Sequence, residues 1–117
     1  MTGFPAAVRA AIRSRSMGIC EACGRRPATQ QHHRDPRGMG GDPRTITNCP
    51  CNGLDLDDAC HAWIEANRTI ARKAGLLLGP GEDPCSEPVL LRAAYGPGWY
   101  RLDVDGGAVW VGSMPWL

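Results

Sequence analysis

The cysteine and histidine residues between positions 20 and 65 constrain this chain more than any other feature. Cys20 and Cys23 form a C-x-x-C pair, and Gly24 allows the tight turn that lets two thiolates face one ion. A redox pair of the thioredoxin type would need a βαβ setting, which the pattern here does not provide. Because we expect no secretion signal, the 6 cysteines are interpreted as metal ligands rather than disulfides. With Cys60 downstream, these residues predict a structural zinc site.

Apolar spacing and turn residues divide the chain into short elements. They predict a helix over residues 5–16 and a second helix that Asp57 or Asp58 caps and that runs to about Ala74. Strands are expected over residues 28–34 and 54–56 and, towards the C-terminus, over residues 88–91, 98–102 and 108–111. The buried side of the second helix is expected to carry Ala59, Trp63, Ala66, Ile70 and Ala74.

The adjacent residues His32 and His33 stand at the end of the first expected strand. Successive side chains of a strand point to opposite faces, so the two rings cannot do the same job. On the second expected helix, His61 and Glu65 are four residues apart and therefore project in the same direction. Ligands of this kind and an imidazole base are the ingredients of metal-assisted hydrolysis.

The net charge of +1 conceals an uneven distribution of charge. Residues 1–44 hold eight arginines against three acidic residues, whereas the rest of the chain is acidic. A basic first third beside a histidine pair suits an anionic partner such as a nucleic-acid backbone. A basic face that serves only solubility remains the alternative.

A C-x-x-C knuckle, a His-His pair, an Asn and a Cys-His pair, in that order, resemble the HNH endonuclease family. The likeness is closest to small HNH nucleases of bacteriophages and actinobacteria, and it rests on the runs HHRDPRGMGG and CHAWIE. It extends from Cys20 to roughly Gly79. The resemblance implies an α+β fold with a ββα-metal, treble-clef-like core. We expect one domain, with a basic N-terminal helix over residues 1–19, the zinc-stapled core over 20–79 and a short β extension over 80–117.

The fourth zinc ligand has several candidates, because the family's usual zinc cysteine falls on Asp57. The expected ligands are Cys20, Cys23, Cys51 and Cys60. Cys49 could replace Cys51 from the same turn, and Asp57 could bind through a carboxylate oxygen. Cys85 is expected to be a bystander thiol.

The resemblance also implies a catalytic ion and its ligands. Mg²⁺, Mn²⁺ or Ni²⁺ would be bound by His32, His61 and Glu65. Glu65 stands where the family often has a second histidine, and a carboxylate is a competent ligand for such ions. His33 would be the general base. A central asparagine would fix the loop that orients this base.

Two asparagines compete for that central position. Asn52 opens the run Asn-Gly-Leu-Asp-Leu, which resembles the common form of the family motif, whereas Asn48 matches the spacing of a longer phage variant. Asn52 is the expected residue and Asn48 the alternative. Contacts to phosphates are expected from Arg9, Arg13, Arg34 and Arg37.

The sequence therefore predicts a metal-dependent DNA endonuclease that hydrolyses phosphodiester bonds, a nickase being one form of this activity. The alternative is a non-catalytic, zinc-stapled module for DNA binding or protein interaction. The expected partner is DNA and not a membrane, and a role within a phage or restriction-type machine is open. The expected location is the cytoplasm, that of the host cell if the protein is phage-encoded.

Overall fold

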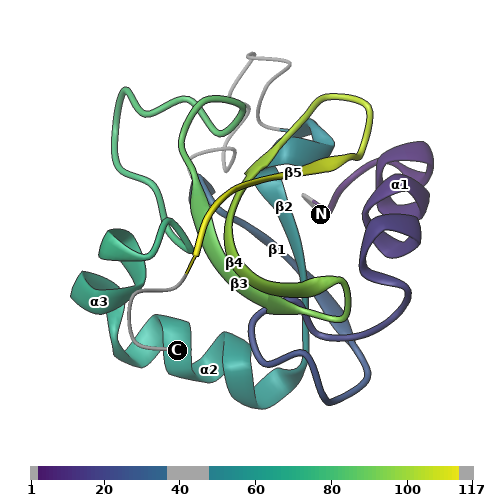
Figure 1. Cartoon of the computed structure of the whole chain (residues 1–117), viewed down its shortest axis with the longest axis horizontal. Coiled ribbons are helices and arrows are strands. Elements are labelled where there is room, and N and C mark those ends of the chain that lie inside the picture. The colour runs from purple at the N-terminus through teal and green to yellow at the C-terminus, as the bar shows by residue number, and fades with distance from the viewer. Residues whose placement is uncertain (1–2, 37–47, 114–117) are drawn as a thin grey trace.

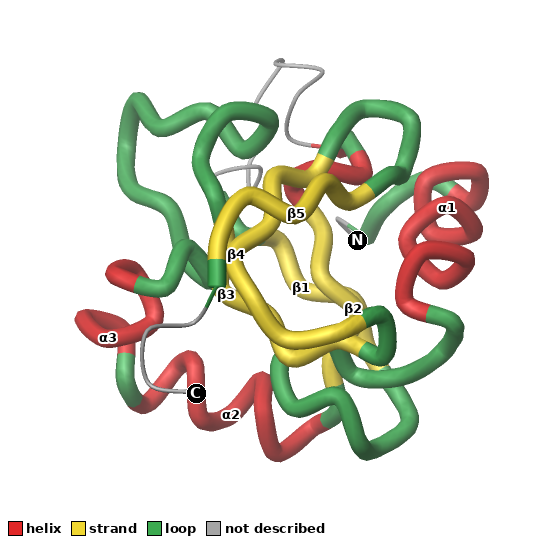
Figure 2. The backbone as a smooth tube through the Cα atoms, viewed as in Figure 1, coloured by secondary structure: helices red, strands yellow, loops and turns green. Residues whose placement is uncertain are grey.

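The computed structural model describes residues 3–36 and 48–113, which form an α+β fold with two antiparallel sheets (Figure 1). The helices of this described part are α1 (Ala6–Ser16), α2 (Asp58–Ala66) and α3 (Arg68–Lys73), with a 3-10 turn η3 (Pro50–Asn52). The strands are β1 (Gln30–His33), β2 (Gly53–Leu56), β3 (Val89–Ala93), β4 (Gly96–Leu102) and β5 (Ala108–Gly112). Both sheets lie near the centre, with the helices around them (Figure 2). The expected α+β class is confirmed.

The two-stranded sheet carries the histidine pair. β1 and β2 are antiparallel, with His32 opposite Leu54 and His33 opposite Gly53. Helix α2 begins directly after Asp57, the residue that follows β2. The two strands therefore lie side by side, α2 follows β2 directly, and both strands are close to their expected ranges.

Helix α1 is joined to this unit by ion pairs. Arg13 donates two hydrogen bonds to the carboxylate of Asp55 on β2, at 2.6 and 3.1 Å. Arg15 is buried and pairs with the buried Glu21 through two contacts of 2.8 Å. The helix agrees with the expected range, except that Pro5 stands at the N-cap position rather than in the first turn. These pairs hold α1 against β2 and against the turn that carries the first cysteines.

The single helix expected up to residue 74 is instead two helices, α2 and α3. Asn67 separates them because its backbone leaves the helical region (φ −129°, ψ 51°). Its side chain donates to the carbonyl of Trp63 at 2.9 Å. The buried positions of α2 and α3 are Ile64 and Ala71. The expected buried side was wrong, since none of its five residues is fully buried: Ala59, Trp63, Ala66, Ile70 and Ala74.

The C-terminal part forms the three-stranded sheet β3–β4–β5, which confirms the three expected strands to within a few residues. Its inward side chains, among them Val89, Leu91 and Leu102, share one core with Leu54 of β2 and Ile64 of α2. The two sheets and α2 are therefore packed as one unit. Among the helices of the described residues, none is long and apolar enough to cross a membrane.

Candidate metal centre

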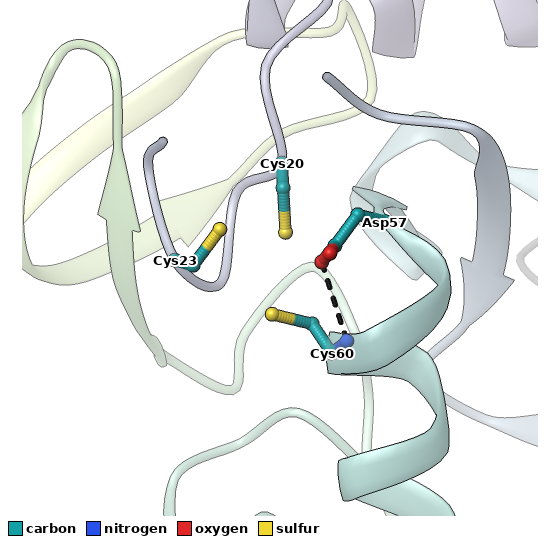
Figure 3. Close-up of side chains that lie close together, drawn as sticks. All are labelled: Cys20, Cys23, Asp57 and Cys60. Carbon is teal, nitrogen blue, oxygen red and sulfur yellow. Dashed lines mark hydrogen bonds between the residues drawn. The ribbon is translucent and has the colours of Figure 1, made fainter. Parts of the chain in front are cut away.

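Four side chains from two parts of the chain meet at the start of α2 (Figure 3). Cys20 and Cys23 come from the turn after α1, and Asp57 and Cys60 come from the first turn of α2 and its cap. One ligand atom of each lies within 4.8 Å of the others. Ligands bound tetrahedrally to zinc at about 2.1–2.3 Å stand roughly 3.5–3.8 Å apart, so this group is compatible with a zinc site.

Gly24 gives the cysteine turn its shape. Its amide donates to the carbonyl of Cys20, and the amide of Cys20 donates to the carbonyl of Arg26, both at 2.8 Å. Gly24 has a φ of 71°, in the left-handed region, and a Cβ there would lie 1.7 Å from the carbonyl oxygen of Arg92 on β3. Both the conformation and the close contact therefore require glycine, as its place after the C-x-x-C pair predicts.

The fourth position of this group belongs to Asp57 and not to Cys51. One oxygen of Asp57 caps α2 by accepting from the amide of Cys60 at 3.2 Å (Figure 3), and the other accepts from Nε of Arg26. Capping holds the carboxylate beside the thiol of Cys60. Cys51 lies in η3, the turn before β2, and it belongs with Cys49 to a separate group. The expected ligand Cys51 is thereby corrected, and the alternative Asp57 takes its place.

Hydrogen bonds and burial shift the pKa values of these four side chains in different directions. Hydrogen bonds with the side chains of Cys60, Cys20 and Arg26 hold the pKa of Asp57 far below its ordinary value, although burial opposes them. Burial raises the pKa of the Cys20 and Cys60 thiols. Binding of a cation would therefore have to displace thiol protons, which makes its affinity dependent on pH.

A second group of metal-type ligands lies between β1 and α2. His32, His61 and Glu65 each place a ligand atom within 4.8 Å of the other two. The two imidazole centroids are 5.3 Å apart, and Nε2 of His61 is 3.9 Å from Oε2 of Glu65. The structure thus brings together the three residues that were expected to bind a catalytic ion. Imidazole nitrogens with one carboxylate suit a divalent transition metal or magnesium.

The surroundings of His32 keep its ring neutral and leave one ring nitrogen with a lone pair that could bind an ion. Its Nε2 lies 3.0 Å from the carbonyl oxygen of Leu76, which can only accept, so Nε2 carries the hydrogen and Nδ1 the lone pair. Burial lowers the pKa of His32 to about 4, so the ring is neutral at pH 7. Metal-binding histidines commonly have a carbonyl partner of this kind. Glu65 is held similarly by Arg68, whose Nη1 donates to Oε1 at 2.7 Å.

His33 faces a different part of the molecule from His32. Its ring stacks on Phe4, in the segment before α1, with centroids 3.9 Å apart and planes 12° from parallel. Its Nε2 lies 3.5 Å from Oδ1 of Asn48. Burial lowers the pKa of His33, against the opposing effects of Asn48 and Asp35. The expectation that the two rings leave the strand on opposite sides is confirmed.

The two candidate asparagines have different surroundings. Asn52 is buried, and its side chain accepts from the amide of Asp35 at 2.8 Å and donates to the carbonyl of Asp35 at 3.3 Å. It therefore holds the backbone just after His33. Asn48, by contrast, contacts the His33 ring itself.

Arg34 is not available to a phosphate, contrary to the expectation. Its side chain is fully buried, with 0% exposed. Its guanidinium donates to backbone carbonyls at 2.9–3.3 Å, and these belong to Cys51, Gly75, Pro84, Glu87 and Pro88. The arginine after the histidine pair therefore connects three segments of the chain through hydrogen bonds. Nothing in the local sequence distinguishes such a buried arginine from an exposed one.

The other expected arginines differ among themselves. Arg9 is exposed and donates to the carbonyl of Phe4 at 2.7 Å. Arg13 is 48% exposed but already paired with Asp55. Both line an open groove of about 480 Å³ that also includes Phe4 and residues 29–31. Arg37 lies outside the described residues.

A third group of metal-type side chains consists of three cysteines that were not expected to lie together. Cys49, Cys51 and Cys85 lie within the same distance limit, and Cys51 and Cys85 are joined by a disulfide. The sulfur of Cys49 is 2.7 Å from that of Cys51 and 3.6 Å from that of Cys85. The expectation of a bystander thiol at Cys85 was therefore wrong, and the disulfide of Cys51 and Cys85 departs from the preference for metal ligands over disulfides. Cys51 and Cys85 are 34 residues apart, and no local sequence pattern indicates that they meet.

Comparisons of the chain with protein-family models, with curated proteins and with solved structures found no match.

Proposed function

We propose that the protein is a metal-dependent endonuclease of the HNH type, built on a ββα-metal core, that hydrolyses phosphodiester bonds in DNA. The observation that carries the proposal is the grouping of His32, His61 and Glu65, with His33 next in the chain. Strand β1 supplies one ligand, His32, and the imidazole of His33, and α2 supplies the other two ligands. Ion ligands and a base are the two requirements of metal-assisted phosphodiester hydrolysis.

His32, His61 and Glu65 would bind the ion, which when present would neutralise charge on the scissile phosphate and on the leaving oxygen. His32 offers Nδ1 because its Nε2 hydrogen is engaged by Leu76. Arg68 restrains the carboxylate of Glu65. The ligands are therefore oriented by contacts within the protein, which limits the entropy lost when an ion binds.

His33 is proposed to accept the proton of the attacking water. A base must be neutral to accept a proton, and burial lowers the pKa of this imidazole. Oδ1 of Asn48 can only accept, so it favours the tautomer with hydrogen on Nε2 and leaves Nδ1 free for the proton. Phe4 stacks against one face of the ring and restricts its rotation.

The zinc-type group supports the same site from a distance. Cys60 is followed directly by His61, so an ion shared by Cys20, Cys23, Asp57 and Cys60 would fix the first turn of α2 against the cysteine turn. That attachment would set the position of His61 relative to His32. We therefore propose structural zinc there and a separate divalent ion for catalysis.

DNA is proposed to approach along the groove that Arg9 and Arg13 line. Phe4 belongs to this groove and also stacks on His33, so the groove and the proposed base have one neighbour in common. Arg9 is the better candidate for a phosphate contact, because Arg13 already neutralises Asp55. Contacts of this kind position the nucleic acid without reading its sequence.

The test is a plasmid assay of the purified protein with Mg²⁺, Mn²⁺ or Ni²⁺ and with EDTA. We expect conversion of supercoiled to open-circular or linear DNA with at least one of these ions and not with EDTA. His33→Ala should abolish most of the conversion, whereas Lys73→Ala, an exposed position of α3 outside the groove, should retain it. A folded, zinc-containing protein that binds DNA without cutting it under any of these conditions would instead support the non-catalytic module.

A further inference from the structure

The three-cysteine group lies in a part of the fold that the proposed nuclease site does not use. Cys49 and Cys51 come from the turn that leads into β2, and Cys85 comes from the loop before β3. Cys49 and Cys51 are buried and Cys85 is half buried. The disulfide uses the sulfurs of Cys51 and Cys85 only, yet the sulfur of Cys49 is in contact with both. A disulfide alone gives no reason for the third sulfur.

A buried cation adjoins the same two segments. Nη1 of Arg34 donates to the carbonyl of Cys51 at 3.0 Å and to the carbonyl of Pro84, the residue before Cys85, at 2.9 Å. The hydrogen-bond partners of this guanidinium in the described residues are carbonyls, which leave its positive charge intact. A buried positive charge stabilises anions nearby. Burial and the carboxylates of Asp83 and Asp103 nevertheless raise the pKa of the Cys49 thiol, so an ion that binds there has to displace its proton.

We propose that Cys49, Cys51 and Cys85, when reduced, form a second metal site that binds a soft divalent ion such as Zn²⁺ through three thiolates. Three converging sulfurs are a donor set that zinc prefers to the harder ions magnesium and calcium. No fourth side chain joins the group within residues 3–36 and 48–113, so water would complete the tetrahedron. The ion would tie the turn before β2 to the loop before β3.

The disulfide and the metal site are alternative states of the same three residues. A thiol reductant supplies the two electrons and two protons that convert the Cys51–Cys85 bond into two thiols. Binding of the ion then releases the three thiol protons. Either state links the same two segments, and Cys49 takes part in the metal-bound state alone.

Cobalt spectroscopy tests this inference independently of any nuclease activity. The reduced protein, freed of zinc, is titrated with Co²⁺, and the thiolate-to-cobalt charge-transfer absorbance is measured at saturation. Histidine and carboxylate ligands do not contribute to that band. We expect Cys85→Ser to lower the absorbance per chain by about half, because three of the 6 cysteines would remain as ligands. Cys49→Ser should have the same effect and yet leave the Cys51–Cys85 disulfide able to form.

Two results would overturn the inference. One is a reduced wild-type protein whose saturated band has the same intensity as that of Cys85→Ser. The other is a Cys49→Ser variant with the full wild-type band. Cys85 is half buried in a loop, so its replacement is the variant more easily accommodated by the fold. If neither variant folds, oxidation of the wild type to the Cys51–Cys85 disulfide must halve the band, and an unchanged band would refute the site.

Discussion

Replacement of Arg34 by methionine is expected to destabilise the fold by about 3–4 kcal/mol without removing a DNA contact. Its buried guanidinium makes hydrogen bonds to five carbonyls. At a net value of about 1 kcal/mol for each bond, their loss costs roughly 5 kcal/mol. Methionine fills part of the space and removes the cost of burying a charge, which returns about 1–2 kcal/mol.

Urea unfolding measured by circular dichroism gives the change in the free energy of unfolding. Arg25→Met is the matched control, because Arg25 is exposed and its replacement should change stability by no more than about 0.5 kcal/mol. Under conditions in which Arg34→Met remains folded, its affinity for DNA should equal that of the wild type. An Arg34→Met protein with wild-type stability and weakened DNA binding would refute this account of the buried arginine.

Four further outcomes follow from the geometry. Gly24→Ala should lose zinc and melt at a lower temperature, because a Cβ would lie 1.7 Å from the Arg92 carbonyl; unchanged melting would show that β3 yields at this contact. Asp57→Asn should keep the α2 cap and weaken zinc binding, whereas Asp57→Ala should also cost about 1 kcal/mol of stability through the lost cap. Equal zinc affinity in Asp57→Asn and the wild type would exclude the carboxylate as a ligand. Arg9→Ala should weaken DNA binding for all sequences and reduce the slope of log affinity against log salt by about one. Fluorescence anisotropy measures this slope, with Arg25→Ala as the control, and an unchanged slope would make the basic face a solubility feature. Because burial lowers the pKa of His33 from 6.5, single-turnover cleavage should be independent of pH around 7 and fall only below about 6.5; a rate that rises as the pH falls would contradict a neutral base.

The sequence predicted the elements that local patterns determine. Alternation and turn residues located β1 and β2, and the helical spacing of His61 and Glu65 correctly placed both on one face of α2. The break at Asn67 was not foreseen, because asparagine is tolerated within helices and its departure from helical geometry depends on the packing around it. Trp63 and Ile70 were expected on the buried side and are exposed, whereas Ile64 and Ala71 belong to the core.

The contacts between distant segments could not be predicted. Arg34 has partners 17–54 residues away, and a basic residue next to a histidine pair has the same local sequence whether it is buried or exposed. Asp57 was foreseen both as a helix cap and as an alternative zinc ligand, and its capping geometry is what selects it over Cys51. The contact of Cys85 with Cys51 depends on how the loop before β3 folds back onto the turn before β2.

The two histidines of the pair are proposed to have separate roles, His32 as a metal ligand and His33 as a base. Cleavage of supercoiled plasmid is measured for His32→Ala, His33→Ala and His61→Ala while the concentration of Mg²⁺ or Mn²⁺ is raised. We expect His33→Ala to lose about two to four orders of magnitude in rate at every metal concentration, because a positioned base is removed. His32→Ala and His61→Ala should recover part of their activity at high metal concentration, because their defect is in ion binding. Recovery of His33→Ala but not of His32→Ala would reverse the two roles, and full activity in all three variants would show that this site does not cut.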